Sequence, residues 1–251
     1  RARVVAGGVG RNTERTFARS AGSRGPAPDG GAPAELIATT ARLNSALRRL
    51  GSGWAIFVEA VRRPAQDYPD SQFPDPASEL VERERAAQFA EEGAHFESGY
   101  FLTLCWMPPA EDAARAESWL YEGKAEKGIN PKELLDLFVD RTDRLLRLVE
   151  GFVPEVAWLN DSETLTYLHS CVSTRNHRVR VPEVPMHLDA LLADEPLTGG
   201  LEPRLSRAHL RTLTVVGFPS STFPGLLDEL NRLAFAYRWS TRAVMLDKTD
   251  A

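Results

Sequence analysis

Residues 33–63 read PAELIATTARLNSALRRLGSGWAIFVEAVRR and predict a helix, a turn and a strand, in that order. Apolar side chains recur at helical spacing through the first half, so we expect an amphipathic helix that begins at Pro33. Gly51 favours the left-handed conformation that ends such a helix. Apolar residues then alternate from Trp54 to Val61, as in a largely buried strand. The apolar stripe of the helix consists of Leu36, Thr40, Leu43, Leu47 and Leu50.

Further helices and strands are expected along the rest of the chain. Capping residues, prolines and apolar periodicity predict the helices, and short apolar runs between turn residues predict the strands. Their order predicts an α+β domain with a mixed or antiparallel sheet, strand-helix-strand units and a helical middle, which also fits ferredoxin-like elements. The expected helices are Asp75 to Gly93, Pro131 to Gly151, Asp161 or Ser162 to Ser173, Leu188 to Leu192 and one from Pro224; the further strands are Tyr100 to Met107, His209 to Phe218 and Tyr237 to Leu246.

Residues 1–33 differ from the rest of the chain in composition. They hold seven of the 18 glycines and six arginines against two acidic residues, and they show no apolar periodicity. We therefore predict a basic Gly/Arg-rich arm, disordered or only loosely attached, in front of a domain that spans residues 34–251. An arm that contacts anionic lipid or nucleic acid is the alternative interpretation of the same composition.

Composition and charge narrow the class of protein. A chain of 251 residues with 43% hydrophobic and 26% charged residues has the balance of a globular domain with a sizeable core. The net charge of -5 gives no reason to expect a nucleic-acid site. The two cysteines, Cys105 and Cys171, are too few for a disulfide framework or a four-thiolate metal site. Because the sequence has no run of about 18 apolar residues and no signal-peptide pattern, we expect a cytoplasmic location.

The common catalytic motifs are missing from the sequence. A P-loop needs Ser or Thr after its Gly-Lys pair, but Gly123 and Lys124 are followed by Ala125. No Gly-x-Ser-x-Gly sequence occurs either. Glutamates in the helix from Asp75 alternate with arginines, a pattern that is typical of a solvated helix face. We therefore predict no catalytic residue and no cofactor-binding residue in this chain.

Histidines and tryptophans are the remaining candidate functional residues. Glu92 and His95 have the Glu-x-x-His spacing of di-iron bundles, but no second copy occurs, so a surface pair at a helix end is expected. The other histidines, at positions 169, 177, 187 and 209, form no i,i+4 pair and no His-x-His sequence, so we predict no metal site. Trp54 and Trp106 are expected in the core, whereas Trp119 is a candidate for an exposed partner contact.

Four stretches resemble the N-terminal domain of TrbE-type conjugal transfer ATPases and the wider VirB/CagE/TrbE family of type IV secretion. The resemblance implies a non-catalytic docking and assembly domain of an ATPase that powers pilus assembly and the transfer of DNA and protein. ATP and Mg²⁺ are then expected only in a C-terminal domain beyond Ala251, so no family catalytic residue carries over to this chain. The four stretches are LNSALRRLGSGWAIFVEAVR (43–62), YPDSQFPDPASELVERERAAQF (68–89), EGAHFESGYFLTLCWMPP (92–109) and FPSSTFPGLLDELNRLAFAYRWSTRAVMLDK (218–248).

The same resemblance implies partners and a location. Inner-membrane components of a conjugation apparatus are the expected partners, self-association is expected of the full-length protein, and peripheral attachment to the inner membrane follows from both. Two alternatives come from other classes of protein. A stand-alone α+β enzyme would show a deep pocket with a strongly shifted pKa. A nucleic-acid-binding module would bind DNA with a steep salt dependence.

Overall fold

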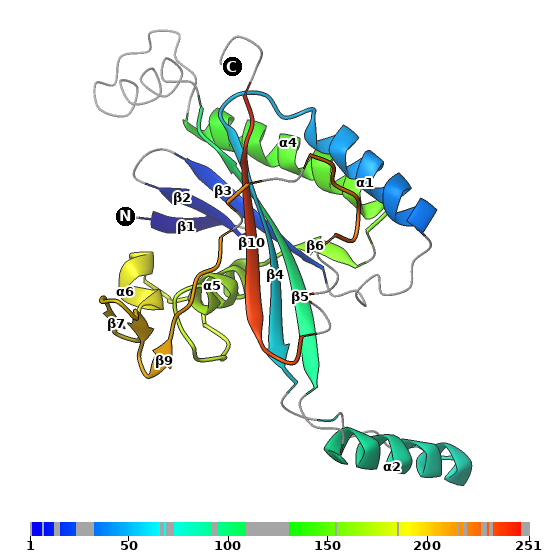
Figure 1. The fold of residues 1–251 in the computed structure, drawn as a ribbon. Helices are drawn as coiled ribbons and strands as arrows, with labels where there is room; N and C mark the ends of the chain where they lie inside the picture. Colours follow the sequence, from blue (N-terminus) through cyan, green and yellow to red (C-terminus); the bar gives the residue numbers. More distant parts are fainter. Residues whose placement is uncertain are drawn as a thin grey trace, which may run out of the picture.

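A seven-stranded antiparallel sheet forms the centre of the computed structural model (Figure 1). Its order is β1–β2–β3–β5–β4–β10, and β6 pairs with β3 beyond the end of β2. The strands are β1 (Ala2–Ala6), β2 (Val9–Asn12), β3 (Phe17–Ser23), β4 (Trp54–Pro64), β5 (Phe96–Trp106), β6 (Val156–Trp158) and β10 (Tyr237–Val244). The structure describes residues 2–6, 8–12, 16–23, 33–65, 68, 73–91, 95–108, 131–153, 155–184, 186–214, 216–217, 220–226, 230 and 233–246.

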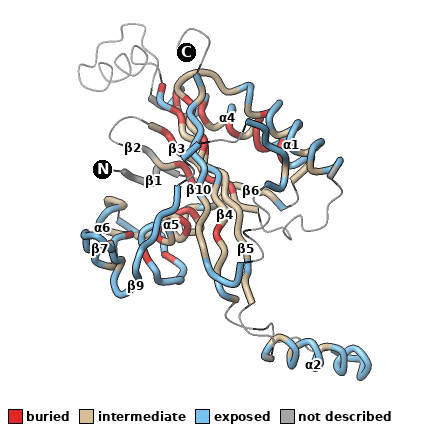
Figure 2. Tube along the Cα trace, in the orientation of Figure 1, coloured by how far each residue is buried: buried red, intermediate tan, exposed pale blue. Residues whose placement is uncertain are grey.

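Helices cover both faces of this sheet. The helices α1 (Pro33–Leu47) and α4 (Pro131–Glu150) pack on the face that carries Leu104 and Trp106 of β5. Side chains alternate along a strand, so Phe101 of β5 points to the opposite face. There it stacks on Tyr167 of α5 (Asp161–Ser170), with ring centroids 4.4 Å apart. The core of the domain therefore lies between the sheet and the α1/α4 layer, where Figure 2 shows most of the buried residues.

Smaller elements lie outside this layered core. The strands β4 and β5 are adjacent and antiparallel, and they form a long hairpin with α2 (Pro76–Glu91) at its far end (Figure 1). Asp75 caps α2 by accepting a hydrogen bond from the Ser78 backbone N–H at 2.9 Å. The helix α6 (Leu188–Leu192) packs on α5, and it is followed by a three-stranded sheet of β7 (Leu197–Thr198), β8 (Arg204–Leu205) and β9 (Ala208–His209).

Four aromatic rings fill the centre of the main core. Phe138 of α4 is fully buried, and its ring stacks against three others at centroid distances between 5.6 and 6.4 Å. These partners come from three different strands, so one side chain of α4 contacts β3, β4 and β5 at once. We call this set the aromatic cluster: Phe17, Trp54, Trp106 and Phe138.

The α+β prediction is confirmed, and most long elements lie where the sequence placed them. The helix α1 begins at Pro33, α4 begins at Pro131, and α6 has the predicted ends. Trp54 and Trp106 are buried as expected. Every strand pairing among the described residues is antiparallel.

The predicted basic arm is wrong for residues 2–6, 9–12 and 17–23, which form three strands of the main sheet. The strand β3 pairs with β5 along its whole length, and Phe17 and Ala21 are buried. Packing around this strand is close, since a Cβ on Gly22 would lie 3.0 Å from the Leu159 side chain. A composition rich in Gly and Arg, without apolar periodicity, was interpreted as disorder, whereas the small residues of β3 permit tight contact. Residues 24–32 of the predicted arm lie outside the described residues.

Two predicted elements near the C-terminal end are not formed as expected. The strand predicted from His209 to Phe218 ends at His209, and residues 210–214 pair with no described strand. Apolar alternation produces a strand only where a neighbouring strand supplies hydrogen bonds. Residues 224–226 form a turn instead of the start of a helix, and most of the remaining predicted helix lies outside the described residues.

Gly53 is required by the turn between α1 and β4, and it, not Gly51, has the positive φ, at 84°. A Cβ at this position would lie 2.7 Å from the carbonyl oxygen of Met107, whose N–H donates to the Gly53 carbonyl at 2.9 Å. We expect Gly53→Ala to lower the free energy of unfolding by about 2 kcal/mol, because it combines backbone strain with a steric clash. Urea unfolding measures this loss. Gly199→Ala is the control, since no atom lies within 4 Å of its Cβ position, and an equal loss in both variants would contradict the explanation.

Candidate functional site

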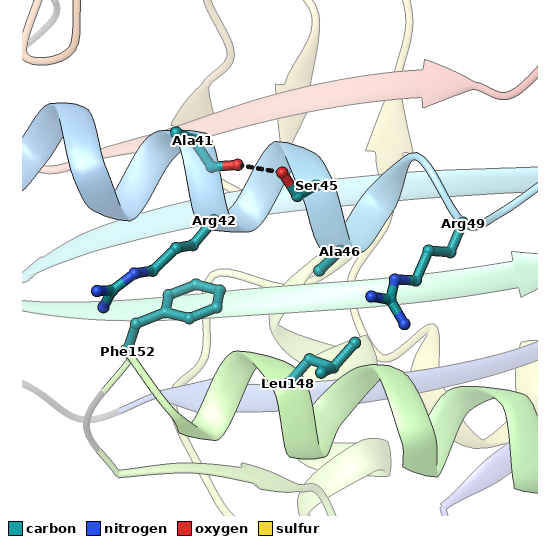
Figure 3. A pocket seen from close by; sticks show the side chains of 7 residues that line it. All are labelled: Ala41, Arg42, Ser45, Ala46, Arg49, Leu148 and Phe152. Atoms are coloured by element: carbon teal, nitrogen blue, oxygen red, sulfur yellow. Dashed lines mark hydrogen bonds between the residues drawn. The ribbon is translucent and has the colours of Figure 1, made fainter.

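A groove runs between α1 and α4 on the outside of the domain, and Figure 3 shows one end of it. This end is a hollow of about 400 Å³. A second hollow, of about 350 Å³, shares Arg49 and Leu148 with the first and continues along α4. We call the two hollows together the α1–α4 groove. Its lining residues are Ala41, Arg42, Ser45, Ala46, Arg49, Leu50, Trp54, Arg141, Arg144, Leu145, Leu148 and Phe152.

The floor of the groove is apolar. Leu148 of α4 and Phe152, just after α4, point toward α1 (Figure 3). The Leu148 residue is 40% exposed although it lines the hollow between the two helices. The Ser45 hydroxyl donates to the Ala41 carbonyl at 2.9 Å, so its proton is not offered to the groove. Exposed apolar surface in a hollow, bordered by polar groups, is typical of an interaction site.

Arginines form the rim of the groove. Arg42 and Arg49 lie along its α1 side, and neither forms an ion pair with another residue that the structure describes. On the α4 side, Arg144 pairs with Asp140 at 2.9 Å, so its charge is partly neutralised. Arg141 lies over the Trp106 ring, 5.9 Å from the ring centroid. Arg42 and Arg49 therefore provide most of the free positive charge at the rim.

The chemistry of the groove is that of binding. None of the described lining residues is a carboxylate, a histidine or a cysteine, so these side chains offer no general acid, general base or metal ligand. An apolar floor with a cationic rim matches an amphipathic helix that presents leucine-like residues on one face and carboxylates at its edges. Arginine is also well suited to such contacts because its planar group binds carboxylates at two points.

The opposite face of the sheet carries a polar network that joins β10 to β4 and α5. Arg238 donates to the Glu59 carboxylate, to the Ser170 carbonyl at 2.9 Å and to the Ser170 hydroxyl at 2.8 Å. It also contacts the Cys171 sulfur at 3.1 Å. Reduced solvation of the sulfur raises the pKa of the Cys171 thiol, although the residue as a whole is exposed, and burial raises the pKa of Cys105 to about 11, so both thiols are protonated at neutral pH. This network is structural, since protonated thiols are poor nucleophiles.

Known proteins match this chain over most of its length. Residues 8–114 match the family model described as the N-terminal domain of the type IV secretion system ATPase VirB4/TrbE. The conjugal transfer protein TrbE of Rhizobium radiobacter is 33% identical over 247 residues, which cover 90% of this chain. In Sinorhizobium fredii, the first portion of a probable conjugal transfer protein TrbE is 37% identical over 105 residues, and the match covers 70% of that protein and 41% of this chain. The chain belongs to the TrbE family.

The family-model match to the TrbE N-terminal domain covers several strands of the main sheet. It includes β2, β3, α1, β4, α2 and β5, so its start at residue 8 lies inside the segment that composition had indicated to be a separate arm. The chain spans about 30% of the length of the Rhizobium radiobacter protein. The predicted setting in conjugation and type IV secretion is confirmed by these matches. Among the described residues of this chain, no helix is both long enough and apolar enough to cross a bilayer.

Several residues that the sequence singled out can now be placed in this TrbE-family domain. His95 stacks on Phe89 with ring centroids 4.0 Å apart, while Glu92 lies outside the described residues. Trp119 and the Gly123–Lys124 pair also lie outside them, so the candidate partner contact at Trp119 stays a prediction. The expected lack of catalytic, cofactor-binding and metal-binding residues likewise stays a prediction.

Sequence reasoning missed two features of the domain. The α1–α4 groove joins residues about 100 positions apart, so no pattern within a single helix indicates it. The second feature is a group of potential metal ligands. Among the described residues, one group of three has ligand atoms close enough to share an ion, and it consists of His169, His177 and Asp194.

Proposed function

We propose that this chain is the N-terminal docking and assembly domain of a conjugal transfer ATPase, and that the α1–α4 groove is its docking surface. The observation that carries the proposal is the combination of an apolar floor with Arg42 and Arg49 at the rim. The expected occupant is an acidic amphipathic helix of an inner-membrane component of the conjugation apparatus. Membership of the TrbE family supports this setting.

The proposal assigns the other activities of the ATPase to other regions of the full-length protein. ATP and Mg²⁺ belong to a C-terminal domain, whose turnover powers pilus assembly and transfer. Peripheral attachment to the inner membrane follows from the docked partner, and self-association follows from contacts in the full-length form. A docking role needs no catalytic group in the groove, which agrees with the residue types that line it.

Reversing the charge of the rim tests the proposal. In the full-length gene, we expect Arg42→Glu with Arg49→Glu to lower the frequency of plasmid transfer by about a hundredfold. Two carboxylates would then face the acidic partner, and like charges at an interface cost several kcal/mol. Plasmid transfer between marked donor and recipient strains measures the effect. A photo-crosslinking amino acid at Leu148 identifies the bound partner in the same strains.

Arg180→Glu with Arg211→Glu is the matched control. Both residues are exposed and lie outside the groove, and the double variant changes the net charge by the same amount. We expect it to transfer at the wild-type frequency, and both double variants to unfold at the wild-type temperature when the purified chains are heated. Wild-type transfer by the groove variant, or an equal defect in the control, would show that the groove is not the docking surface.

A further inference from the structure

Three potential metal ligands meet on the side of the domain opposite α1 and α4. His169 lies in the last turn of α5, His177 follows in the irregular segment, and Asp194 follows α6. One ligand atom from each lies within 4.8 Å of those of the other two. Nε2 of His169 and Oδ2 of Asp194 lie 3.2 Å apart, and the two imidazole rings have centroids 4.4 Å apart.

His169 provides the second, independent observation. Its side chain is 2% exposed, yet neither ring nitrogen forms a hydrogen bond with any residue that the structure describes, since the Nε2 contact with Asp194 has the distance but not the geometry of one. A buried polar group without a hydrogen bond costs about 1–3 kcal/mol, so such groups are uncommon unless an ion or a ligand satisfies them. The imidazole nitrogen that faces Asp194 and His177 is therefore available as a ligand atom.

We propose that His169, His177 and Asp194 bind a Zn²⁺ ion. Two imidazole nitrogens and one carboxylate oxygen suit Zn²⁺, and three protein ligands leave its fourth tetrahedral position to water. Water can reach this position because His177 and Asp194 are exposed. Sequence spacing predicted no metal site because the three ligands belong to separate segments, which are brought together only when α6 packs on α5.

One neighbouring charge opposes the ion. Nη1 of Arg175 lies 3.4 Å from the same Asp194 oxygen, and its guanidinium also approaches Glu195, with Nε 3.7 Å from Oε1. The Arg175 side chain is 62% exposed, so it can move away from Asp194 and keep its contact with Glu195. Glu195 is a second carboxylate near the site, but we do not count it as a ligand because it already accepts hydrogen bonds from Ser173 and Thr174.

The ion would stabilise a region of the chain that has little core of its own. The apolar cluster beneath α5 and α6 contains three buried residues, Leu165, Val179 and Leu192, and most of the segment from 171 to 196 has no regular structure. Small structural units of this kind commonly depend on a metal, whose binding free energy adds to the folding free energy. Binding of the ion would therefore join the end of α5 to the two segments that follow, while its fourth position stays open to water.

Zinc binding by the tag-free 251-residue chain tests the proposal. After metal removal with a chelator, Zn²⁺ is added back, and the bound metal is measured against a competing zinc dye. We expect one saturable equivalent, and a Co²⁺-substituted form with the strong visible absorption of tetrahedral coordination. His177→Gln and Asp194→Asn, both at exposed positions, are expected to weaken Zn²⁺ binding by about tenfold or more. Zn²⁺ should also raise the unfolding temperature of the wild-type chain but of neither variant.

His209→Gln is the control variant. His209 also pairs with a carboxylate, that of Glu202 at 3.1 Å, but in the described structure this pair has no third ligand. We expect the His209→Gln variant to bind Zn²⁺ with the affinity of the wild-type chain. The absence of a saturable equivalent in the wild-type chain, or equal affinity in the wild type, His177→Gln and Asp194→Asn, would overturn the proposal. Circular dichroism of the metal-free variants separates lost ligands from lost folding.

Discussion

A chain that begins at residue 24 is expected not to fold. The deletion removes β3, which pairs with β5 over seven positions and with β2 and β6 on its other side. It also removes Phe17 from the aromatic cluster and uncovers the edge of β5 beside Leu104 and Trp106. Loss of one large core aromatic side chain alone costs about 3–5 kcal/mol, against a total stability of about 5–15 kcal/mol.

The deletion also breaks the polar contact between β3 and α4. Arg19 donates to Asp143 at 2.6 Å, and the Trp158 indole N–H donates to the same carboxylate oxygen at 2.8 Å. The Arg19 guanidinium lies over the Trp158 ring, 4.2 Å from its centroid. Without Arg19, the half-buried carboxylate of Asp143 loses its charged partner. The resulting loss of stability adds to the loss caused by the broken hydrogen bonds of the sheet.

Circular dichroism and urea unfolding of the truncated chain measure this effect. The matched control replaces residues 69–92, which include α2, by a short Gly-Ser loop. This change removes about as many residues as the truncation, but α2 has no buried residue in the described structure, and Figure 2 shows it largely exposed. We expect the control to unfold cooperatively with nearly wild-type stability. A cooperative transition of residues 24–251 near that of the full chain would contradict the role given to β3.

Phe138→Ala is expected to cause the largest loss among single substitutions, about 3–5 kcal/mol in the free energy of unfolding. Phe138 is 0% exposed and stacks on Phe17, Trp54 and Trp106, so its removal leaves a cavity that three strands border. For a domain of this size, the loss corresponds to a fall of about 10 °C in Tm.

Urea unfolding and calorimetry of the purified variants measure the loss at Phe138. Leu137→Ala is the control on the same helix, because Leu137 is 39% exposed and its truncation leaves no closed cavity. We expect the control to lose about 1 kcal/mol or less. Equal losses at the two positions would mean that the aromatic cluster is not the main source of stability in this layer.

Periodicity predicted the elements whose burial is regular along the chain. In the sequence, Leu135, Phe138, Thr142, Leu145 and Val149 share one face of the predicted helix. In α4 the last four are buried, and Leu135 is partly buried against the same core. The strand β3 was missed because its packing depends on small residues, and small residues carry no apolar signal. Gly22 lies against Leu159, which is more than a hundred positions away in the sequence, so this close contact is visible only in three dimensions.

The candidate sites were missed for a related reason. Arg42 and Leu148 border one groove, yet they lie on two different helices and more than 100 positions apart in the sequence. His169 and Asp194 lie 25 positions apart, beyond the spacings that join metal ligands within one helix or hairpin. Sequence patterns describe contacts within an element well, whereas these sites form between elements.

The pairing of β4 with β10 has a consequence for the synthesis of the protein. Glu59 contacts Arg238, which is 179 positions later, and β10 covers one edge of β4 along eight residues. Ribosomes add about 5–20 residues per second, so this edge of β4 stays uncovered for on the order of ten seconds. An uncovered strand edge invites pairing with other chains. Chaperone protection of the nascent chain is therefore most needed in the interval between the emergence of β4 and that of β10.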